Sequence, residues 1–573
     1  MAFWSHFLTG SAWSTSKSKP DSRDLTKFFG SQIGGKSVIN YAYTDMPGKL
    51  LAFDVYYFFT FAWAIPYILL PLTPADSGEL DELSLTLQNV FCIFIHVILC
   101  ALQLAFILAL PLSVLLPVWT VVLGAACFFL VNQALCSLLN GRKSEYHSDP
   151  EYAPRLPEHD HEQWIFINGV AVGEHWMKNN LNRLAVTFRR PVLGIHNRTN
   201  GIIFDVVECL VQRSFGFATS DVRICYSIIK EKLYDPRYSK IIFILHSQGG
   251  IEGSMVLDWL LQELPQDLLS KIEVYTFGNA ANHFNNPHRL VGSQEEAFRR
   301  PVLGSLDATR VDFMTSPTAE SAAEQDNRPP TPTTPREPVE GDDNSTAGPI
   351  RSSLNKLSLL SETSSVRPTL LSDRAIGHIE HYAHTTDFVA LWGVLHFATS
   401  KPRSHLLPRF IGRVFARTSA RGGHQLCHHY LDGMFPLARD PATGAFLGAA
   451  DGEGENAFME SEVTVGVEGD EMDNAREALE FSYATMGIGG VNLNEAPLRR
   501  LEREVEIHSV DDRPPESRGR YRHRRTGRTG ALTANVKVKD LSRLWQYRNG
   551  LSPGDKAPFL ASDATGLTRI ATL

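Results

Sequence analysis

The stretch Ile244-Leu245-His246-Ser247-Gln248-Gly249-Gly250 decides the fold that we expect for this chain. It continues Ile241 to Leu245, an unbroken apolar run typical of a strand that is buried on both faces. An amphipathic pattern from Gly250 to Leu264 follows and predicts a helix. A serine on a sharp turn between a strand and a helix exposes its hydroxyl above the sheet, and small residues must surround it. The two glycines meet that requirement, so Ser247 is the candidate nucleophile.

Short strand-like runs alternate with amphipathic helices around this stretch, which is typical of a parallel sheet covered by helices. The sequence therefore predicts an α/β domain. Its expected strands are Trp164 to Ile167, Val192 to Ile195, Ile272 to Phe277, His378 to His384 and Phe410 to Phe415, and its expected helices include Asp221 to Leu233 and Asp387 to Phe397.

Two motifs resemble a known family. His246-Ser247-Gln248-Gly249-Gly250 looks like the nucleophile elbow of lipases and esterases in the α/β-hydrolase superfamily, and Val274-Tyr275-Thr276-Phe277-Gly278-Asn279 is similar to the Y-T-F-G strand of the class 3 lipases. The resemblance covers residues 163 to 437 apart from an insert, and it departs at Leu245, where G-x-S-x-G has its first glycine. It implies an α/β-hydrolase fold, hydrolysis of an acyl ester or amide in the order Ser, Asp, His, and no cofactor. It does not identify a substrate.

Asp387 is the candidate acid, because in this fold the acid follows a strand that comes after the nucleophile. It lies just past the expected strand His378 to His384. The alternative is that Asp387 caps the helix that begins there, a position that aspartate favours. Asp373 is the chief rival acid, but it precedes the strand.

His424 is the candidate base, since it is the first residue after the flexible pair Gly422-Gly423. A loop position lets its ring reach the nucleophile. His429 is the alternative, although the expected helix Gln425 to Leu431 turns it inward, where it would bond a backbone carbonyl. His428 is expected on the more exposed face of that helix.

An oxyanion hole needs two backbone donors. One is the N–H of Gln248, directly after the nucleophile. For the other we expect the backbone around Gly169 and Val170, where the run Ile165 to Val170 leaves its strand; an ordinary loop is the alternative.

A metal site is not expected. His378, His381 and His384 are spaced by three, and residues three apart on a strand point to opposite faces. Neither an HExxH motif nor a CxxC pair occurs in the chain.

Residues Leu83 to Leu139 carry no Asp, Glu, Lys or Arg, which predicts two membrane spans joined near Pro111 to Pro117. The alternative is a buried helical hairpin of a soluble core. The aromatic run Val55 to Leu72 is a third candidate span, kinked at Pro66.

The expected organisation combines these segments around one interrupted α/β domain. The net charge of -8 argues against nucleic acid as a main partner, and the basic run Arg518 to Arg528 is expected to be solvated. The predicted parts are a polar segment 1–49, a transmembrane region 50–140 of two or three spans, α/β segments 160–291 and 375–440 around a disordered insert 292–374, and a low-complexity tail 441–573.

The charged residues beside the spans give two conflicting predictions for the membrane orientation. The linker Thr73 to Glu82 lacks Lys and Arg and follows a basic N-terminal segment, which places the linker away from the cytosol. Arg142 and Lys143, directly after the last span, favour a cytosolic α/β domain instead. We expect the cytosolic orientation, which requires that one apolar segment does not cross.

Together these patterns predict an integral membrane protein that cleaves a hydrophobic acyl ester with Ser247, Asp387 and His424, in contact with membrane lipids. One alternative is acyl transfer by the same three residues. Another is a non-catalytic membrane scaffold that keeps the fold.

Deleting residues 300–370 should leave the domain folded, because the insert offers little apolar surface to a core and loop closure entropy grows only slowly with length. A soluble deletion variant with a single cooperative melting transition is the expected result. Aggregation or degradation of that variant would contradict the prediction.

Overall fold

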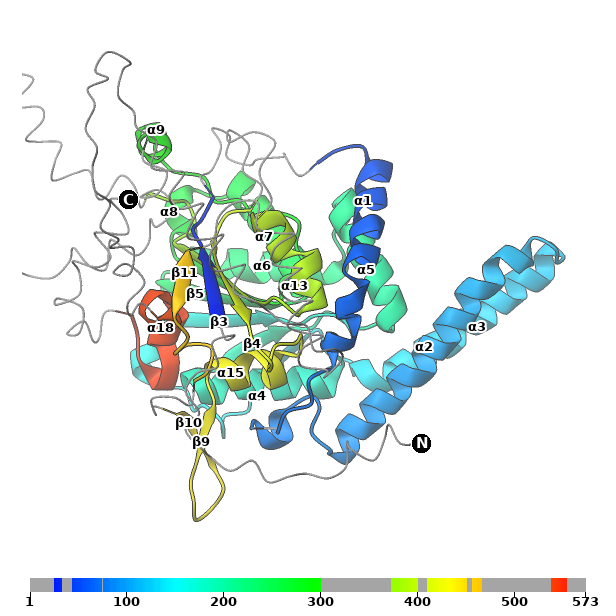
Figure 1. Ribbon diagram of the computed structural model, residues 1–573, viewed down its shortest axis with the longest axis horizontal. Helices are drawn as coiled ribbons and strands as arrows, with labels where there is room; N and C mark the ends of the chain where they lie inside the picture. The colour runs from blue at the N-terminus through cyan, green and yellow to red at the C-terminus, as the bar shows by residue number, and fades with distance from the viewer. Residues whose placement is uncertain are drawn as a thin grey trace, which may run out of the picture.

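A mostly parallel mixed sheet forms the centre of the protein (Figure 1). The computed structural model describes residues 25–32, 44–74, 76–299, 373–399, 410–450, 456–465 and 537–553. In spatial order the strands are β11 (Val463–Val465), β1 (Leu25–Phe29), β8 (Arg413–Thr418), β7 (His378–His384), β6 (Ile272–Phe277), β5 (Lys240–His246), β3 (Glu162–Ile167), β4 (Val192–Ile195) and β2 (Glu145–His147). Strands β8 to β4 run parallel, while β1 is antiparallel to β8 and β2 is antiparallel to β4.

Helices cover both faces of this sheet, with α7 and α13 on one side and α4 and α15 on the other (Figure 1). The first face carries α1 (Pro47–Thr60), α5 (Ile202–Phe215), α6 (Ser220–Tyr234), α7 (Gly249–Glu263), α13 (Phe388–Trp392) and α14 (Val394–Thr399). The second carries α4 (Glu174–Phe188), η4 (Leu426–Leu431), α15 (Asp432–Met434), α18 (Val538–Leu541) and η5 (Leu544–Gly550). Smaller elements are η1 (Ala62–Ile68), η2 (Gly78–Leu80), η3 (Pro157–His159), α8 (Gln266–Leu269), α9 (Val291–Arg299), and the hairpin of β9 (Leu437–Arg439) and β10 (Phe446–Ala449).

Strand β5 contributes to both hydrophobic clusters. Ile241, Phe243 and Leu245 pack with α6 and α7, whereas Ile242 and Ile244 join the cluster on the α4 face. Alternate side chains of a strand point to opposite faces, so an unbroken apolar run fits a strand covered on both sides. The sequence prediction for this strand is confirmed.

Two expected elements differ from the structure. Strand β8 begins at Arg413 and not at Phe410, because Gly412 has a φ of 132° and donates its N–H to Ser31 Oγ at 3.1 Å. The helix expected from Asp387 to Phe397 is broken at Gly393. Gly393 has a non-helical φ of -110° and ψ of -111°, and the N–H of the next residue, Val394, donates to Asn279 O at 2.9 Å instead of continuing the helix.

The sheet domain extends beyond the boundaries expected at residues 160 and 440. Strand β1 comes from the segment expected to be polar, and β11, α18 and η5 come from the expected tail. The C-terminal extension is attached to the sheet through Glu273, a buried acid on β6. Glu273 accepts hydrogen bonds from Arg543 (3.0 Å) and from the Tyr547 hydroxyl (2.9 Å). Most of the insert and the run Arg518 to Arg528 lie outside the described residues.

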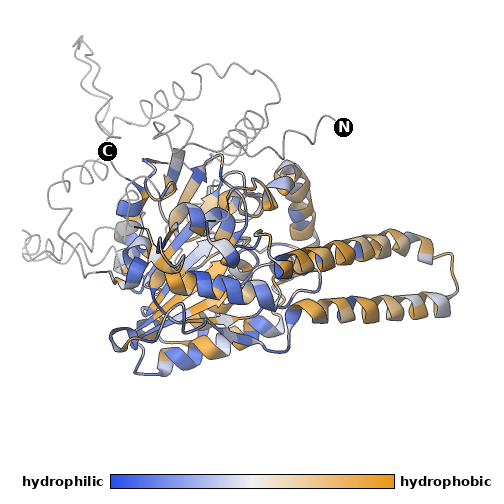
Figure 2. Cartoon of the chain, turned by 90° about the horizontal axis from the view of Figure 1, so that it is seen from below, coloured by the Kyte–Doolittle hydropathy of each residue, from blue (hydrophilic) through white to orange (hydrophobic). Residues whose placement is uncertain are grey.

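Helices α2 (Leu87–Ser113) and α3 (Val118–Asn140) form a hairpin that projects from the domain (Figures 1 and 2). Among the described residues, these two helices are long and apolar enough to cross a membrane. The third candidate is a bent pair, α1 and η1, with an angle of 71° between the two helices. Because β1 and β2 belong to one sheet on either side of this region, the chain between them crosses any membrane an even number of times.

The bent pair packs against the α/β domain. Asp54 of α1 is buried and pairs with Arg213 of α5 at 3.0 Å, and its carbonyl accepts the indole N–H of Trp392 at 3.1 Å. The outer face of α1 exposes Phe53 and Phe59. This segment therefore makes polar contacts with the domain on one face and exposes apolar side chains on the other.

Asp54→Ala should lower the stability of the fold by about 3 to 5 kcal/mol, because it leaves the Arg213 guanidinium buried without its charge partner. Asp45→Ala is the control, since Asp45 pairs with Lys49 near the surface and exposed pairs contribute about 0 to 1 kcal/mol. Thermal unfolding of both variants in detergent measures the difference. Equal melting midpoints would show that the buried pair does not hold α1 in place.

Candidate active site

Ser247 lies on the turn between β5 and α7, with a φ of 58°. A residue with a Cβ adopts this left-handed conformation at a cost of about 1 to 3 kcal/mol. The turn is held because the N–H of Ser247 donates to Phe277 O (3.1 Å) and its carbonyl accepts from the N–H groups of Gly250 (3.0 Å) and Ala280 (3.1 Å). The strained serine at a strand end is the feature that the sequence motif predicted.

Close packing around the turn explains the departure at Leu245. A Cβ at Gly253 of α7 would lie 2.3 Å from Leu245 Cδ1, so this glycine provides the space that the leucine side chain takes. A Cβ at Gly169 would lie 2.4 Å from Ser247 Cβ. The expected fit of Leu245 against the neighbouring helix is therefore achieved by a glycine on that helix.

Ser247, His424 and Asp387 form a hydrogen-bonded chain. His424 Nε2 lies 2.9 Å from Ser247 Oγ, and His424 Nδ1 lies 2.9 Å from Asp387 Oδ2. The three side chains come from the turn after β5, the loop after β8 and the turn after β7. All three residues are buried. The geometry lets His424 accept the proton of the serine hydroxyl while Asp387 fixes the orientation of the ring.

Asp387 makes the contacts of both roles that the sequence allowed. Its Oδ2 contacts His424, while its Oδ1 accepts the N–H groups of Val389 (2.8 Å) and Ala390 (3.3 Å) and so caps α13. The Tyr430 hydroxyl donates to Oδ2 at 2.7 Å. Burial alone would raise the pKa of Asp387, but the charge of His424 and these hydrogen bonds outweigh it and lower the pKa below its ordinary value.

The rival acid Asp373 has other contacts. It accepts the N–H of Leu290 at 2.8 Å and pairs with Arg289 at 3.3 Å. Asp373 thus links the segment before β7 to Arg289 and Leu290.

His429 is a buried structural residue, as the helix pattern predicted. Its Nδ1 accepts the N–H of Gln425 at 2.9 Å, and its Nε2 lies 3.1 Å from Pro71 O. Burial and the neighbouring His428 lower the pKa of His429 well below its ordinary value. The ring is therefore a neutral donor to a backbone carbonyl.

The prediction that His428 is exposed is wrong. His428 is buried, and its Nδ1 lies 2.7 Å from Asp81 Oδ2. Helical periodicity did not reveal this contact because the linker Thr73 to Glu82 packs over the helix, and because Leu426–Leu431 is a π-helix, which changes the faces.

Two further contacts on His424 were not found from the sequence. The backbone N–H of His424 donates to Tyr67 O at 3.2 Å, so the bent N-terminal segment holds the histidine loop. His246 Nε2 lies 2.9 Å from His424 O, and the two rings stack with centroids 4.8 Å apart. Burial and then the charge of His424 lower the pKa of His246 to about 3, so the neutral ring donates to that carbonyl.

The expected oxyanion donors lie around the nucleophile. Gly169 is packed against Ser247, and Gln248 follows it as the N-cap of α7. Within the described ranges, the backbone N–H groups of Val170 and Gln248 have no intramolecular acceptor. Neither group is therefore engaged by a backbone acceptor in these ranges, as an oxyanion donor requires.

A buried polar network fixes the loops that carry these donors. Asn197 donates its side-chain amide to Gln248 Oε1 at 2.9 Å, and its backbone N–H donates to Asn168 Oδ1 at 2.9 Å. Asp205 accepts the N–H of Ala171 at 3.0 Å. Burial raises the pKa of Asp205 to about 6 although these hydrogen bonds oppose it.

One cluster among the described residues has the composition of a metal site: Asp81, His428 and Asp432. Its donors are already engaged. His428 contacts Asp81, while Asp432 accepts from the Ser77 hydroxyl and from Arg183 at 3.4 Å. The cluster therefore joins the linker to the α/β domain, and the arginine opposes a cation. We assign no metal ligand to it.

The histidines of β7 do not converge. His378 contacts Glu380 and Arg413, His381 contacts Thr276 Oγ1 at 2.8 Å, and His384 Nε2 lies 3.2 Å from His429 O. This divergence agrees with the alternation expected for a strand.

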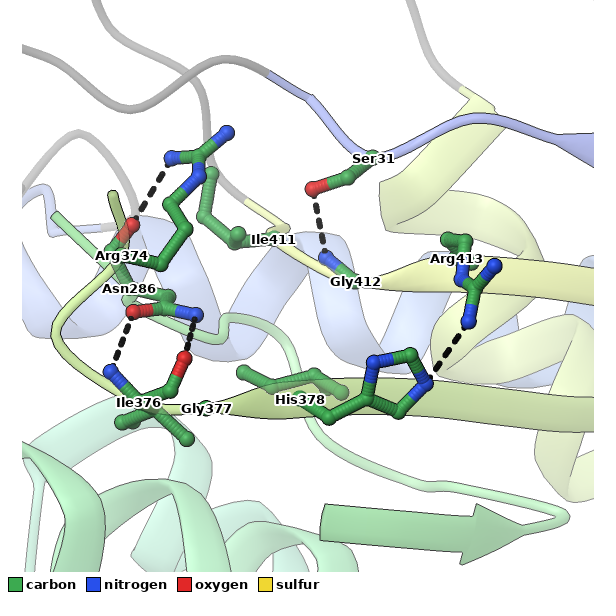
Figure 3. A pocket seen from close by; sticks show the side chains of 10 residues that line it. Ser31, Asn286, Arg374, Ile376, Gly377, His378, Ile411, Gly412 and Arg413 are labelled. Carbon is green, nitrogen blue, oxygen red and sulfur yellow. Dashed lines mark hydrogen bonds between the residues drawn. The ribbon is translucent and has the colours of Figure 1, made fainter. Parts of the chain in front are cut away.

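A hollow lies at the amino ends of β7 and β8 (Figure 3). Ser247 follows the carboxyl end of β5, so the hollow lies at the opposite end of the parallel strands. Figure 3 shows that its polar side chains are engaged in hydrogen bonds, mostly with backbone groups. The Asn286 amide bridges both backbone groups of Ile376, and Arg413 lies 2.7 Å from His378. The one hydroxyl among the residues that line the hollow, that of Ser31, accepts the N–H of Gly412 and donates to the carbonyl of Gln32, each at 3.1 Å, so this serine is bonded to the backbone and not to a base.

Comparison of this chain with protein-family models, curated proteins and solved structures finds no match. The interpretation of the site therefore rests on its geometry.

Replacing the two histidines separately tests which one is the base. His424→Ala should stay folded and lose about 10³-fold or more in ester turnover. His429→Ala should lose about 1 to 3 kcal/mol of stability, since it leaves buried backbone groups without partners, and should retain activity. Thermal unfolding and turnover of both variants provide the measurement. A destabilised, active His424→Ala together with a folded, inactive His429→Ala would reverse the assignment.

Proposed function

We propose that this protein is a membrane-anchored serine hydrolase of the α/β-hydrolase fold that cleaves a hydrophobic carboxylic ester. The observation that carries the proposal is the chain from Asp387 through His424 to Ser247, with both contacts at 2.9 Å, on a serine of left-handed φ. A mostly parallel sheet with this turn at the end of a central strand supports it. The complete set of three residues argues against the non-catalytic scaffold.

The reaction follows from the contacts. Ser247 Oγ attacks the ester carbonyl while His424 Nε2 takes its proton, and Asp387 stabilises the resulting imidazolium. The N–H groups of Val170 and Gln248 stabilise the oxyanion. Collapse of the tetrahedral intermediate breaks the ester bond, and His424 gives its proton to the leaving alkoxide. Water then attacks the acyl-enzyme with the same base and restores Ser247.

The surroundings favour a lipid-like substrate. The outer faces of α2 and α3 are apolar, and the neighbouring α1 exposes Phe53 and Phe59. These surfaces would keep the domain at the bilayer surface, where a hydrophobic ester is concentrated. Acyl transfer to another acceptor remains the second candidate, favoured by the burial of Ser247, which is 2% exposed and so shielded from water.

We propose two membrane crossings with the catalytic domain in the cytosol. Thr73 and Asp81 of the acidic linker contact His428, which puts the linker on the same side as the domain and weakens the charge argument for a non-cytosolic linker. Arg142 and Lys143 then stand as the cytosolic positive charges beside the hairpin. The free cysteines Cys209, Cys225 and Cys427 of the domain suit a reducing compartment.

Labelling with a fluorophosphonate probe tests the function. The wild-type chain in detergent should be labelled, and Ser247→Ala should not, because the probe reacts with an activated serine. Ser227→Ala, which removes an exposed hydroxyl on α6, is the matched control and should be labelled like the wild type. Equal labelling of wild type and Ser247→Ala, or of neither, would refute the proposed function.

A further inference from the structure

The membrane hairpin carries a line of polar side chains that face the α/β domain. On α2 these are Asn89, His96 and Gln103, which recur every seven residues, and on α3 they are Asn132 and Asn140. All five are buried. Polar side chains in a membrane helix are costly unless they find partners, so such a line on one face marks a contact surface.

Gln103 and the two asparagines of α3 bind the loop before α5. The Gln103 amide donates to Asn200 O at 2.7 Å, and the Asn132 amide donates to the same oxygen at 3.2 Å. Asn140 exchanges hydrogen bonds with the backbone of Thr199, at 2.7 and 3.0 Å. The domain-proximal halves of α2 and α3 therefore dock on the domain.

His96 makes a different contact, with the loop of the oxyanion donors. Its Nε2 lies 2.8 Å from Ala171 O, so Nε2 carries the hydrogen and donates it. The ring stacks on Trp176 with centroids 5.5 Å apart and an interplanar angle of 10°. These two contacts fix the ring against the domain.

Ala171 directly follows Val170, whose N–H is the expected oxyanion donor. Its φ is 67°, an unfavourable conformation for alanine. Asp205 binds the N–H of Ala171 and His96 binds its carbonyl. The two peptide groups that flank this residue are therefore held from opposite sides, one by the domain and one by the membrane helix.

We propose that His96 is a positioning residue for the oxyanion hole, and that the membrane hairpin is a structural part of the active site as well as an anchor. This inference rests on the proposed hydrolase function. Without the hydrogen bond from His96, Ala171 is free to leave its left-handed conformation and the Val170 N–H turns away from the developing oxyanion. The cost appears in the transition state, because negative charge develops on the oxygen there and is absent from the bound ester.

Isosteric replacements of His96 separate the hydrogen bond from the packing. His96→Gln places an amide N–H at the position of Nε2, whereas the shorter His96→Asn places it at the position of Nδ1. His96→Phe keeps an aromatic ring on Trp176 and removes the donor. Asn132→Ala is the control, since it weakens hairpin docking without touching the oxyanion loop.

The measurement is kcat and KM of the full chain in detergent with a soluble short-chain p-nitrophenyl ester. Loss of one oxyanion donor lowers kcat by about 10² to 10³-fold. His96→Phe and His96→Asn should lower kcat by about 10 to 100-fold with KM changed less than about threefold, a smaller loss because the donor is displaced and not removed. His96→Gln should recover kcat to within about threefold, and Asn132→Ala should match the wild type.

Ser247→Ala in the same series distinguishes failure of the positioning role of His96 from failure of the proposed hydrolase function. If it is inactive while His96→Phe and His96→Asn keep wild-type kcat, the positioning role is refuted and the hydrolase function stands. A loss of kcat in His96→Gln equal to that in His96→Asn also refutes the role. If Ser247→Ala retains wild-type turnover, both proposals fall.

Discussion

The left-handed backbone at Ser247 is the constraint on which the site depends. A serine resists this conformation, so it persists only where neighbouring groups hold it. Phe277 at the end of β6 and Ala280 in the loop that follows bind its backbone, and Gly169 leaves room for its Cβ. Strand β5 supplies the rigid support, because its apolar side chains are buried on both faces of the sheet. The stability of the sheet core thus maintains the strain at the nucleophile.

The N-terminal region supports both sides of this turn. On one side, the carbonyl of Tyr67 accepts the N–H of His424 and that of Pro71 contacts His429. On the other, His96 of the hairpin contacts Ala171 beside the oxyanion donors. Buried polar groups need partners, and here the N-terminal segments provide partners for the loops that carry the candidate site. The N-terminal region is therefore bonded directly to the loops that carry the candidate site residues.

A buried ion pair and a partly buried one join segments that are far apart in the chain. Asp54 and Arg213 attach α1 to α5, and Glu273 and Arg543 attach the C-terminal elements to β6. Burying two charges costs desolvation energy that their attraction only partly offsets. Removing one partner costs much more, because the remaining charge stays buried. Such pairs therefore disfavour any other docking of these segments.

The sequence by itself determined the elements whose signals are local. An apolar run followed by small residues predicted β5, the turn at Ser247 and α7, because strand burial and steric crowding act over a few neighbouring residues. The order of strands after the nucleophile pointed to Asp387, and the glycine pair pointed to His424. The uncharged stretch predicted α2 and α3, since a bilayer demands apolar length and little else.

The features that depend on contacts between distant residues were decided only by the tertiary structure. The burial of His428 under the linker, the accommodation of Leu245 by Gly253, and the contact of His96 with Ala171 all join residues far apart in space or sequence. The membership of β1 and η5 in the sheet domain has the same cause, since a short strand or helix is defined by what it packs against. Periodicity records which face of an element is apolar, but not which loop covers that face. The position of the candidate nucleophile on its turn was therefore predictable from the sequence, while the contacts that hold it there were not.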